Sequence, residues 1–255
     1  MIHETAIIDP ASWLDEDVEV GPYSIIGAGV KIGSGTVIGP HVQIECNSEI
    51  GRNNRILQAA SIGGEPQDLS FKGQKTYVKI GDGNTIREFA TIHRATKDGT
   101  ATTIGDENYI MAYAHMGHDV NVGNGTILCN GIGLSGHVEV GDKAVISAYV
   151  GIHQFSRIGT MSMIGALARI NQDVLPYTLV DGNPATTRGL NAVGLKRNGI
   201  SAENRKNLKS AYKHLCRSGL SLDSGLEKIN ELVENTDEVS SLIDFAKTSK
   251  RGFIR

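Results

Sequence analysis

Four of the eight histidines have neighbours that could give them a chemical role. His118 is followed directly by Asp119, and a carboxylate beside an imidazole can fix the ring tautomer that accepts a proton. His137 ends a Ser-Gly-His turn in which the backbone N–H of Gly136 could meet a developing oxyanion. The other two histidines are His115 and His153. The set predicts a general base for acyl transfer, which removes the proton from an attacking hydroxyl or amine.

Zinc binding is the competing chemistry, because three neutral imidazoles form a common zinc ligand set. The β-helical carbonic anhydrases take two of their ligands from a His-x-x-x-x-His pair. No two histidines of this chain have that spacing. The sequence therefore favours the general base, and we expect neither a metal nor a cofactor.

The histidines lie within a six-residue repeat that runs from Ile2 to Ile170. Every sixth residue is Ile, Leu, Val or Met except at Asp68, Gln74 and Asp98, and glycine often follows the aliphatic residue. An α-helix repeats its apolar face about every 3.6 residues and a strand about every 2, so neither produces this period. A short strand followed by a corner does, and three hexapeptides complete one coil of a triangular prism. We expect glycine and asparagine where the corners require unusual dihedrals.

The repeat predicts an all-β parallel β-helix, which is left-handed in proteins with this repeat, followed by a small C-terminal α-helical domain. We place the β-helix at residues 1–190 and the helical domain at 191–255. The missed slots predict two loops, near 63–79 and 94–103, which replace whole hexapeptides and keep the register of the flanking coils. The Pro- and Gly-containing passage 173–194 is interpreted as an exit loop, and three amphipathic helices are expected after it.

One wall of the prism recurs at every third slot, so Met116, Leu134 and Ile152 belong to the same wall of three successive coils. Each of the four histidines lies within three residues of one of these slots. We therefore expect the histidines along one edge, within two coil rises or about 10 Å.

Composition and charge exclude several classes of protein. The formal net charge of −3 argues against nucleic-acid binding. An odd number of cysteines, Cys46, Cys129 and Cys216, suggests reduced thiols and a cytoplasmic protein. No segment has the length and apolarity of a transmembrane span, and the N-terminus does not resemble a signal peptide. The basic stretch from Lys196 to Arg217 predicts either a solvated helix face or a docking surface for an acidic partner.

Eight motifs occur in a fixed order along the chain: Gln67-Asp68-Leu69, Thr91-Ile92-His93-Arg94, Ala114-His115-Met116-Gly117-His118-Asp119, Ser135-Gly136-His137, His153-Gln154-Phe155, Gln172-Asp173-Val174, Gly194-Leu195-Lys196-Arg197 and Arg251-Gly252-Phe253-Ile254-Arg255. With them, the chain resembles the UDP-N-acetylglucosamine O-acyltransferases over essentially its whole length. The resemblance implies transfer of an R-3-hydroxyacyl chain from acyl carrier protein to the glucosamine 3-hydroxyl of UDP-N-acetylglucosamine, the first step of lipid A biosynthesis.

The resemblance also implies roles for single residues. The implied catalytic residues are His118 as the base, Asp119 as its orienting partner and Gly136 as the source of the oxyanion N–H. The implied substrate contacts are Asp68, His115, His137 and Gln154 to the sugar nucleotide, His153 and Ala166 along the acyl groove, and Arg197 at the nucleotide end. Members of the family are homotrimers with sites between subunits, and the basic stretch would then bind the acidic carrier protein.

The chain departs from the family pattern at three places. Ser70 stands where a lysine is common, with Lys72 the nearest replacement, and Asn198 stands where a second arginine is common. Ala166 stands where the acyl groove often has glycine, so we expect a shorter acyl chain. The selectivity should be modest, because one methylene is worth about 1–3 kcal/mol.

Three other functions remain open at this point. An N-acyltransferase for a 3-amino UDP-sugar would use the same base. An acetyl-CoA-dependent hexapeptide transferase would share the repeat. A non-catalytic scaffold would explain the repeat but not the histidine edge.

Overall fold

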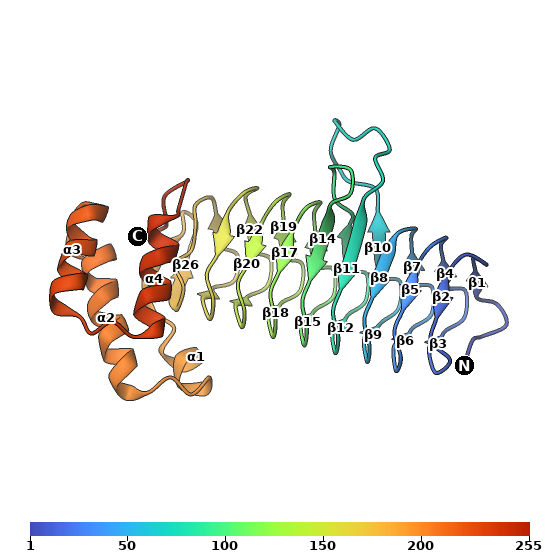
Figure 1. The fold of residues 1–255 in the computed structure, drawn as a ribbon, viewed down its shortest axis with the longest axis horizontal. Coiled ribbons are helices and arrows are strands. Elements are labelled where there is room, and N and C mark those ends of the chain that lie inside the picture. The colour runs from blue at the N-terminus through green and yellow to red at the C-terminus, as the bar shows by residue number, and fades with distance from the viewer.

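The computed structural model describes all of residues 1–255, and its repeats form the predicted left-handed parallel β-helix (Figure 1). The strands of the repeat pair in parallel with strands of the neighbouring coils, so three sheets form the walls of a prism. The nine-stranded sheet contains β1 (Ile7–Ile8), β4 (Ile25–Ile26), β7 (Gln43–Ile44), β10 (Ser61–Gly64), β13 (Thr91–His93), β16 (His115–Met116), β19 (Gly133–Leu134), β22 (Gly151–Ile152) and β25 (Arg169–Ile170). The eight-stranded sheet contains β2 (Trp13–Leu14), β5 (Lys31–Ile32), β8 (Ser48–Ile50), β11 (Tyr77–Ile80), β14 (Ala101–Ile104), β17 (Asn121–Val122), β20 (Glu139–Val140) and β23 (Arg157–Ile158). The ten-stranded sheet contains β3 (Glu19–Val20), β6 (Val37–Ile38), β9 (Arg55–Ile56), β12 (Thr85–Ile86), β15 (Tyr109–Ile110), β18 (Ile127–Leu128), β21 (Val145–Ile146), β24 (Met163–Ile164), β26 (Thr178–Asp181) and β27 (Thr186–Leu190).

The aliphatic residue of each hexapeptide points into the prism, as the repeat predicts. Ile26, Ile32 and Ile38 contribute one side chain from each wall of a single coil, and each is at most 1% exposed. These side chains belong to one continuous column of 39 buried residues. Removing such a side chain from water contributes about 1.5–3 kcal/mol. The interior therefore holds the walls in place and leaves the corners free to carry functional groups.

Two segments without strands leave the same edge of the prism, between the nine- and eight-stranded sheets. One joins β10 to β11 and the other joins β13 to β14, and together they project from the ribbon (Figure 1). The pairing of the walls continues past both, since Ile62 pairs with Ile44 on one side and Ile92 on the other. The coils around the insertions thus keep their register. We call residues 65–76 the first insertion loop and residues 94–100 the second.

The glycine that follows many aliphatic residues has a different role from the one we expected. Gly33 is not among the residues with positive φ. A Cβ there would lie 2.9 Å from the carbonyl carbon of Gly51, so this glycine permits close stacking of coils. The left-handed corners are occupied both by glycines, such as Gly29 (φ 69°), and by larger residues, including Asp119 (φ 58°) and His137 (φ 60°).

The passage 173–194 is not the exit loop that the sequence suggested. It contains β26, which extends the ten-stranded sheet, and β27, which pairs antiparallel with β26 and so ends the solenoid. The helices after it are α1 (Ala192–Arg197), α2 (Ala202–Cys216), α3 (Leu222–Leu232) and α4 (Asp237–Lys247). Ser201 caps the N-terminus of α2, where its side chain accepts a hydrogen bond from the Asn204 N–H.

The C-terminal helices pack around a second cluster of 13 buried residues that includes Leu175 and Phe253. The chain end returns to the solenoid, where Asp173 forms a parallel bridge with Phe253. The predicted division into domains at residues 190 and 191 stays a prediction. None of the four helices is long and apolar enough to cross a membrane.

Candidate active site

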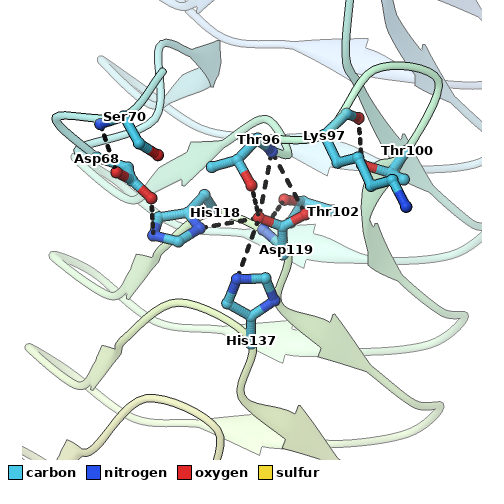
Figure 2. Close-up of polar contacts among 9 residues, drawn as sticks. All are labelled: Asp68, Ser70, Thr96, Lys97, Thr100, Thr102, His118, Asp119 and His137. Atoms are coloured by element: carbon cyan, nitrogen blue, oxygen red, sulfur yellow. Dashed lines mark hydrogen bonds and ion pairs between the residues drawn. The ribbon is translucent and has the colours of Figure 1, made fainter. Parts of the chain in front are cut away.

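The corner between the nine- and eight-stranded sheets carries a dense group of polar side chains. We call it the histidine edge. His118 and Asp119 lie in the corner between β16 and β17, and His137 lies in the next corner, between β19 and β20. The first insertion loop brings Asp68 to the same place, as Figure 2 shows. The convergence of His118 and His137 that the repeat predicts is therefore confirmed, and their rings lie edge to face with centroids 5.2 Å apart.

His118 and Asp119 form the closest ionisable pair of the edge. The His118 Nδ1 lies 2.9 Å from Asp119 Oδ2, and both side chains are less than 15% exposed. Because a carboxylate only accepts hydrogen bonds, Nδ1 must carry the proton in the neutral imidazole. The His118 Nε2 then has a free lone pair, and it faces Asp68 Oδ2 at 4.0 Å. This tautomer can accept a proton from a substrate hydroxyl.

Asp119 is held by two threonines that the sequence analysis did not include in the site. The Thr96 hydroxyl donates to Asp119 Oδ2 at 2.7 Å, and the Thr96 N–H lies 3.2–3.3 Å from both carboxylate oxygens. The backbone N–H of Asp119 donates to the Thr102 hydroxyl at 2.9 Å. These contacts fix Asp119 in its left-handed corner. No repeat position marks Thr96, because it lies in the second insertion loop.

His137 and Asp68 complete the polar surface around the imidazole. The His137 Nε2 lies 3.7 Å from Asp119 Oδ2, and its ring stacks on Phe155 with centroids 4.6 Å apart. Asp68 accepts a hydrogen bond from the Ser70 N–H at 2.8 Å. Hydrogen bonding by Ser70, with a smaller contribution from the nearby histidines, lowers the pKa of Asp68. Asp68 is therefore an anion at neutral pH.

Gly136 lies directly against the His118 ring. A Cβ at residue 136 would be 2.4 Å from the His118 Cε1 and 2.5 Å from Nε2. Any residue larger than glycine would therefore displace the His118 ring. The backbone N–H of Gly136 makes no hydrogen bond within the chain. It is therefore free to donate to a substrate oxygen.

A second histidine pair lies next to His118 on the nine-stranded wall, with His115 in β16 and His93 one coil earlier in β13. The His115 Nδ1 is hydrogen-bonded to the Thr91 hydroxyl at 2.7 Å. The His115 ring lies edge to face against the His93 ring, with centroids 5.0 Å apart. Burial, with smaller effects of neighbouring charges, lowers the pKa of His93 to about 4, and burial likewise lowers the pKa of His115. His93 was not among the residues predicted for the site, although it directly follows Ile92, which pairs with Met116 on the same wall.

The two depressed pKa values predict a loss of stability in acid. The unfolded chain protonates these rings near their usual pKa of 6.5, whereas the folded chain binds a proton at His93 only near pH 4. The free energy of unfolding should therefore be highest above pH 6.5 and decrease as the pH falls toward 4. Urea titrations across this range would measure the slope. His93→Gln should reduce it, whereas His3→Gln, at an exposed position, should not. An equal slope in all three proteins would contradict the prediction.

Four of the residues that the sequence analysis assigned to substrate contacts make no contact with this cluster. His153 and Gln154 are exposed in the next corner of the histidine edge, where the His153 Nδ1 contacts the Gln154 carbonyl oxygen at 3.1 Å. Ala166 lies between β24 and β25, at the corner of the ten- and nine-stranded sheets, so it is on a different edge. Arg197 is exposed at the end of α1. A single chain thus does not bring Ala166 beside His118.

The same atoms could in principle face a metal ion. His118, Asp119 and His137 offer one ligand atom each, all within 4.8 Å of one another. The Asp119 Oδ2, however, already accepts hydrogen bonds from His118 and from the Thr96 hydroxyl. His118, Asp119 and Thr96 therefore form a hydrogen-bonded acid–base group.

Comparison with known proteins identifies the family. The profile described as UDP-N-acetylglucosamine O-acyltransferase, domain 2, matches residues 173–254, and that of the bacterial transferase hexapeptide matches residues 11–46. The acyl-[acyl-carrier-protein]--UDP-N-acetylglucosamine O-acyltransferase of Burkholderia orbicola is 51% identical, with 100% of this chain and 99% of that protein aligned. That of Halorhodospira halophila is 46% identical, again over 100% and 99% of the two chains.

Solved structures give the same result. The UDP-N-acetylglucosamine acyltransferase of Francisella novicida has a TM-score of 0.96 and is 41% identical, covering 100% of this chain and 94% of that one. The enzyme of Bacteroides fragilis has a TM-score of 0.98 and is 38% identical, with full coverage of both chains. Together with the hexapeptide solenoid, its helical C-terminus and the histidine edge, these full-length similarities show that the chain belongs to the UDP-N-acetylglucosamine O-acyltransferase family.

Proposed function

We propose that this protein transfers an R-3-hydroxyacyl chain from acyl carrier protein to the glucosamine 3-hydroxyl of UDP-N-acetylglucosamine, the first step of lipid A biosynthesis. The observation that carries the proposal is the His118–Asp119 pair, whose outward Nε2 faces Asp68 across 4.0 Å. The family relationship over the whole chain names the substrates.

His118 acts as the general base in the proposed reaction. Its Nε2 removes the proton from the sugar 3-hydroxyl while the oxygen attacks the thioester carbonyl of the donor. The new oxyanion accepts a hydrogen bond from the Gly136 N–H, which has no competing partner within the chain. Collapse of the intermediate breaks the carbon–sulfur bond, and the imidazolium returns its proton to the departing thiolate. Asp119 stabilises the imidazolium during this cycle.

The remaining residues bind the substrates in this proposal. Asp68 accepts hydrogen bonds from the sugar, and its lowered pKa keeps it ionised at neutral pH. The other proposed contacts to the sugar nucleotide are His115, His137 and Gln154, with Arg197 at the nucleotide end. His153 and Ala166 line the acyl groove. Lys72 stays the proposed replacement for the lysine that is common at Ser70, and its ammonium group donates to the Leu69 carbonyl of the same loop at 3.1 Å.

The position of Ala166 supports a homotrimer. It lies on a different edge from His118, so the groove can be completed only when the edge of a second copy packs against the histidine edge. A prism has flat walls that suit threefold packing. We expect a trimer in solution, and the molar mass from light scattering would measure it. A monomer with full activity would contradict this assembly.

The basic stretch of the C-terminal helices supports docking of an acidic carrier protein. Arg188, Arg205, Lys209, Lys213 and Arg217 line a cavity of about 610 Å³ together with Tyr212 and Leu195. Positive charge on a protein of net charge −3 gives this face a local attraction for an acidic partner. We therefore assign acyl transfer to the β-helix, residues 1–190, and carrier docking to residues 191–255. Since its three cysteines are unpaired, we expect the enzyme in the cytoplasm.

The proposed groove makes Ala166 a determinant of acyl length. Replacing Ala166 with glycine removes a methyl group and should move the preferred chain longer by one or two carbons. The change in selectivity should be about tenfold, because one methylene is worth about 1–3 kcal/mol. Competition between carriers loaded with chains of graded length, analysed by mass spectrometry, would measure it. The hypothesis fails if the native enzyme already prefers the longest chain.

The same mass-spectrometric assay tests the reaction itself. The wild-type protein is incubated with loaded carrier proteins and either UDP-N-acetylglucosamine or its 3-amino analogue. Acylation of UDP-N-acetylglucosamine is the expected result. Product only with the amino analogue would identify an N-acyltransferase, and no product with either acceptor would refute the carrier-dependent reaction.

A further inference from the structure

We propose that Arg94 is a positioning residue, which holds the first insertion loop so that Asp68 stays opposite His118. The proposal rests on the function given above for its effect on catalysis. Its structural part concerns only the loop and can be tested without substrates.

Arg94 is unusually buried for an arginine, with 8% of its surface exposed. A buried guanidinium is expensive unless several partners satisfy it. Its Nη1 donates to the Gly63 carbonyl at 2.8 Å, and its Nη2 lies 3.3 Å from Glu65 Oε1. The guanidinium carbon also lies 5.3 Å from the centre of the Phe71 ring. Arg94 therefore contacts Gly63 in β10 and two residues of the first loop, and its Nη1 also lies 3.8 Å from Glu45 Oε2 in the preceding coil.

These contacts enclose the part of the loop that carries Asp68. Glu65 precedes Asp68 by three residues and Phe71 follows it by three, so one side chain holds both flanks. The far part of the loop is held differently, because the Lys75 N–H donates to Asp98 and the Lys75 carbonyl accepts from Gly99. Leu69, beside Asp68, is 98% exposed and contributes no packing. Pro66, between Glu65 and Asp68, is buried, and Arg94 is the side chain that contacts the loop on both sides of Asp68.

The second insertion loop consequently orients both carboxylates around the base. Arg94 holds the loop of Asp68, and Thr96, two residues later, binds Asp119 directly. Asp68 and Asp119 lie on the two nitrogens of the same imidazole, at 4.0 Å from Nε2 and 2.9 Å from Nδ1. A movement of Arg94 should disturb the Nε2 side, where the acceptor sugar binds, and leave the Nδ1 side intact.

We expect Arg94→Met to raise the KM for UDP-N-acetylglucosamine about ten- to a hundredfold, since small displacements of a binding group have effects of this size. The kcat should fall much less. Arg94→Lys should recover only part of the loss, because an ammonium group cannot reproduce the planar fork. The matched control is Arg52→Met, which removes an arginine that is exposed and has no side-chain partner. Its KM should equal that of the wild type.

A double substitution shows whether Arg94 acts through Asp68. If it does, Arg94→Met should raise the KM in the wild-type background but have little further effect in Asp68→Ala. Additive effects of the two changes would overturn the proposed route. Should Arg94→Met not fold, Arg94→Lys serves in the same cycle.

Hydrogen exchange of the apoprotein provides the readout that does not depend on the reaction. Residues 65–71 should exchange faster in Arg94→Met than in the wild type or in Arg52→Met, whereas the β16–β17 corner should not change. Unchanged exchange of residues 65–71 would overturn the proposal. Faster exchange in a protein that acylates neither acceptor would retain the positioning role and refute only the proposed function.

Discussion

Replacing His118 with alanine is expected to lower kcat by at least about a hundredfold while leaving the fold intact. A general base typically contributes a factor of about 10² to 10⁴, and no other group at the edge offers a free nitrogen opposite Asp68. The KM for UDP-N-acetylglucosamine should change much less, because the other proposed sugar contacts remain. Steady-state kinetics with saturating acyl carrier protein would separate the two constants.

The control for this change is His3→Ala, which removes an exposed histidine from the first coil. It should retain wild-type kinetics. Circular dichroism and thermal unfolding should show both variants folded. If folded His118→Ala keeps kcat within about threefold of the wild type, His118 is not the base and the proposed mechanism is wrong.

Gly136→Ala is expected to have the second-largest effect. The added methyl group would lie 2.4 Å from the His118 ring, so the ring must move away from its position between Asp119 and Asp68. The same movement separates the base from the neighbouring N–H that would stabilise the oxyanion. We expect kcat to fall by about 10²-fold, within the range seen when a catalytic group is misplaced by about 1 Å.

Gly133 provides a matched control in the same coil. A Cβ at Gly133 would meet no atom within 4 Å, so Gly133→Ala should be folded and active. The comparison isolates the contact with the His118 ring from the general effect of changing a glycine in the solenoid. Similar kinetics for the two variants would show that the ring tolerates the methyl group.

The six-residue repeat was sufficient to predict the scaffold because its interior is nearly uniform. One aliphatic residue per wall fixes which strands stack, and the spacing of Met116, Leu134 and Ile152 therefore predicted that His118 and His137 share an edge. It could not predict Thr96 or Arg94, since both follow a strand into an insertion where the repeat is lost. The contacts that orient the catalytic groups come from these insertion loops, which have no repeat.

The errors at the end of the solenoid have a different cause. Gly182 and Pro184 suggested that the whole passage is a loop, but they form only the short turn between the paired strands β26 and β27. Strand pairing with β24 decides the structure there, but Leu179 follows its partner Met163 by 16 residues instead of the 18 of a regular coil, so the six-residue repeat does not reveal the strand. The family resemblance implied the role of Ala166, and the sheet order shows that it lies on another edge than His118.

The two insertions leave the pairing of Ile44, Ile62, Ile92 and Met116 unbroken. Because the stack of coils does not depend on what is inserted, these loops can lengthen, shorten or change sequence with little cost to folding; doubling a loop adds only about 0.6 kcal/mol of closure entropy. Mutation can therefore alter acceptor recognition while the stability of the scaffold stays nearly constant. The prism separates the evolution of specificity from the maintenance of the fold.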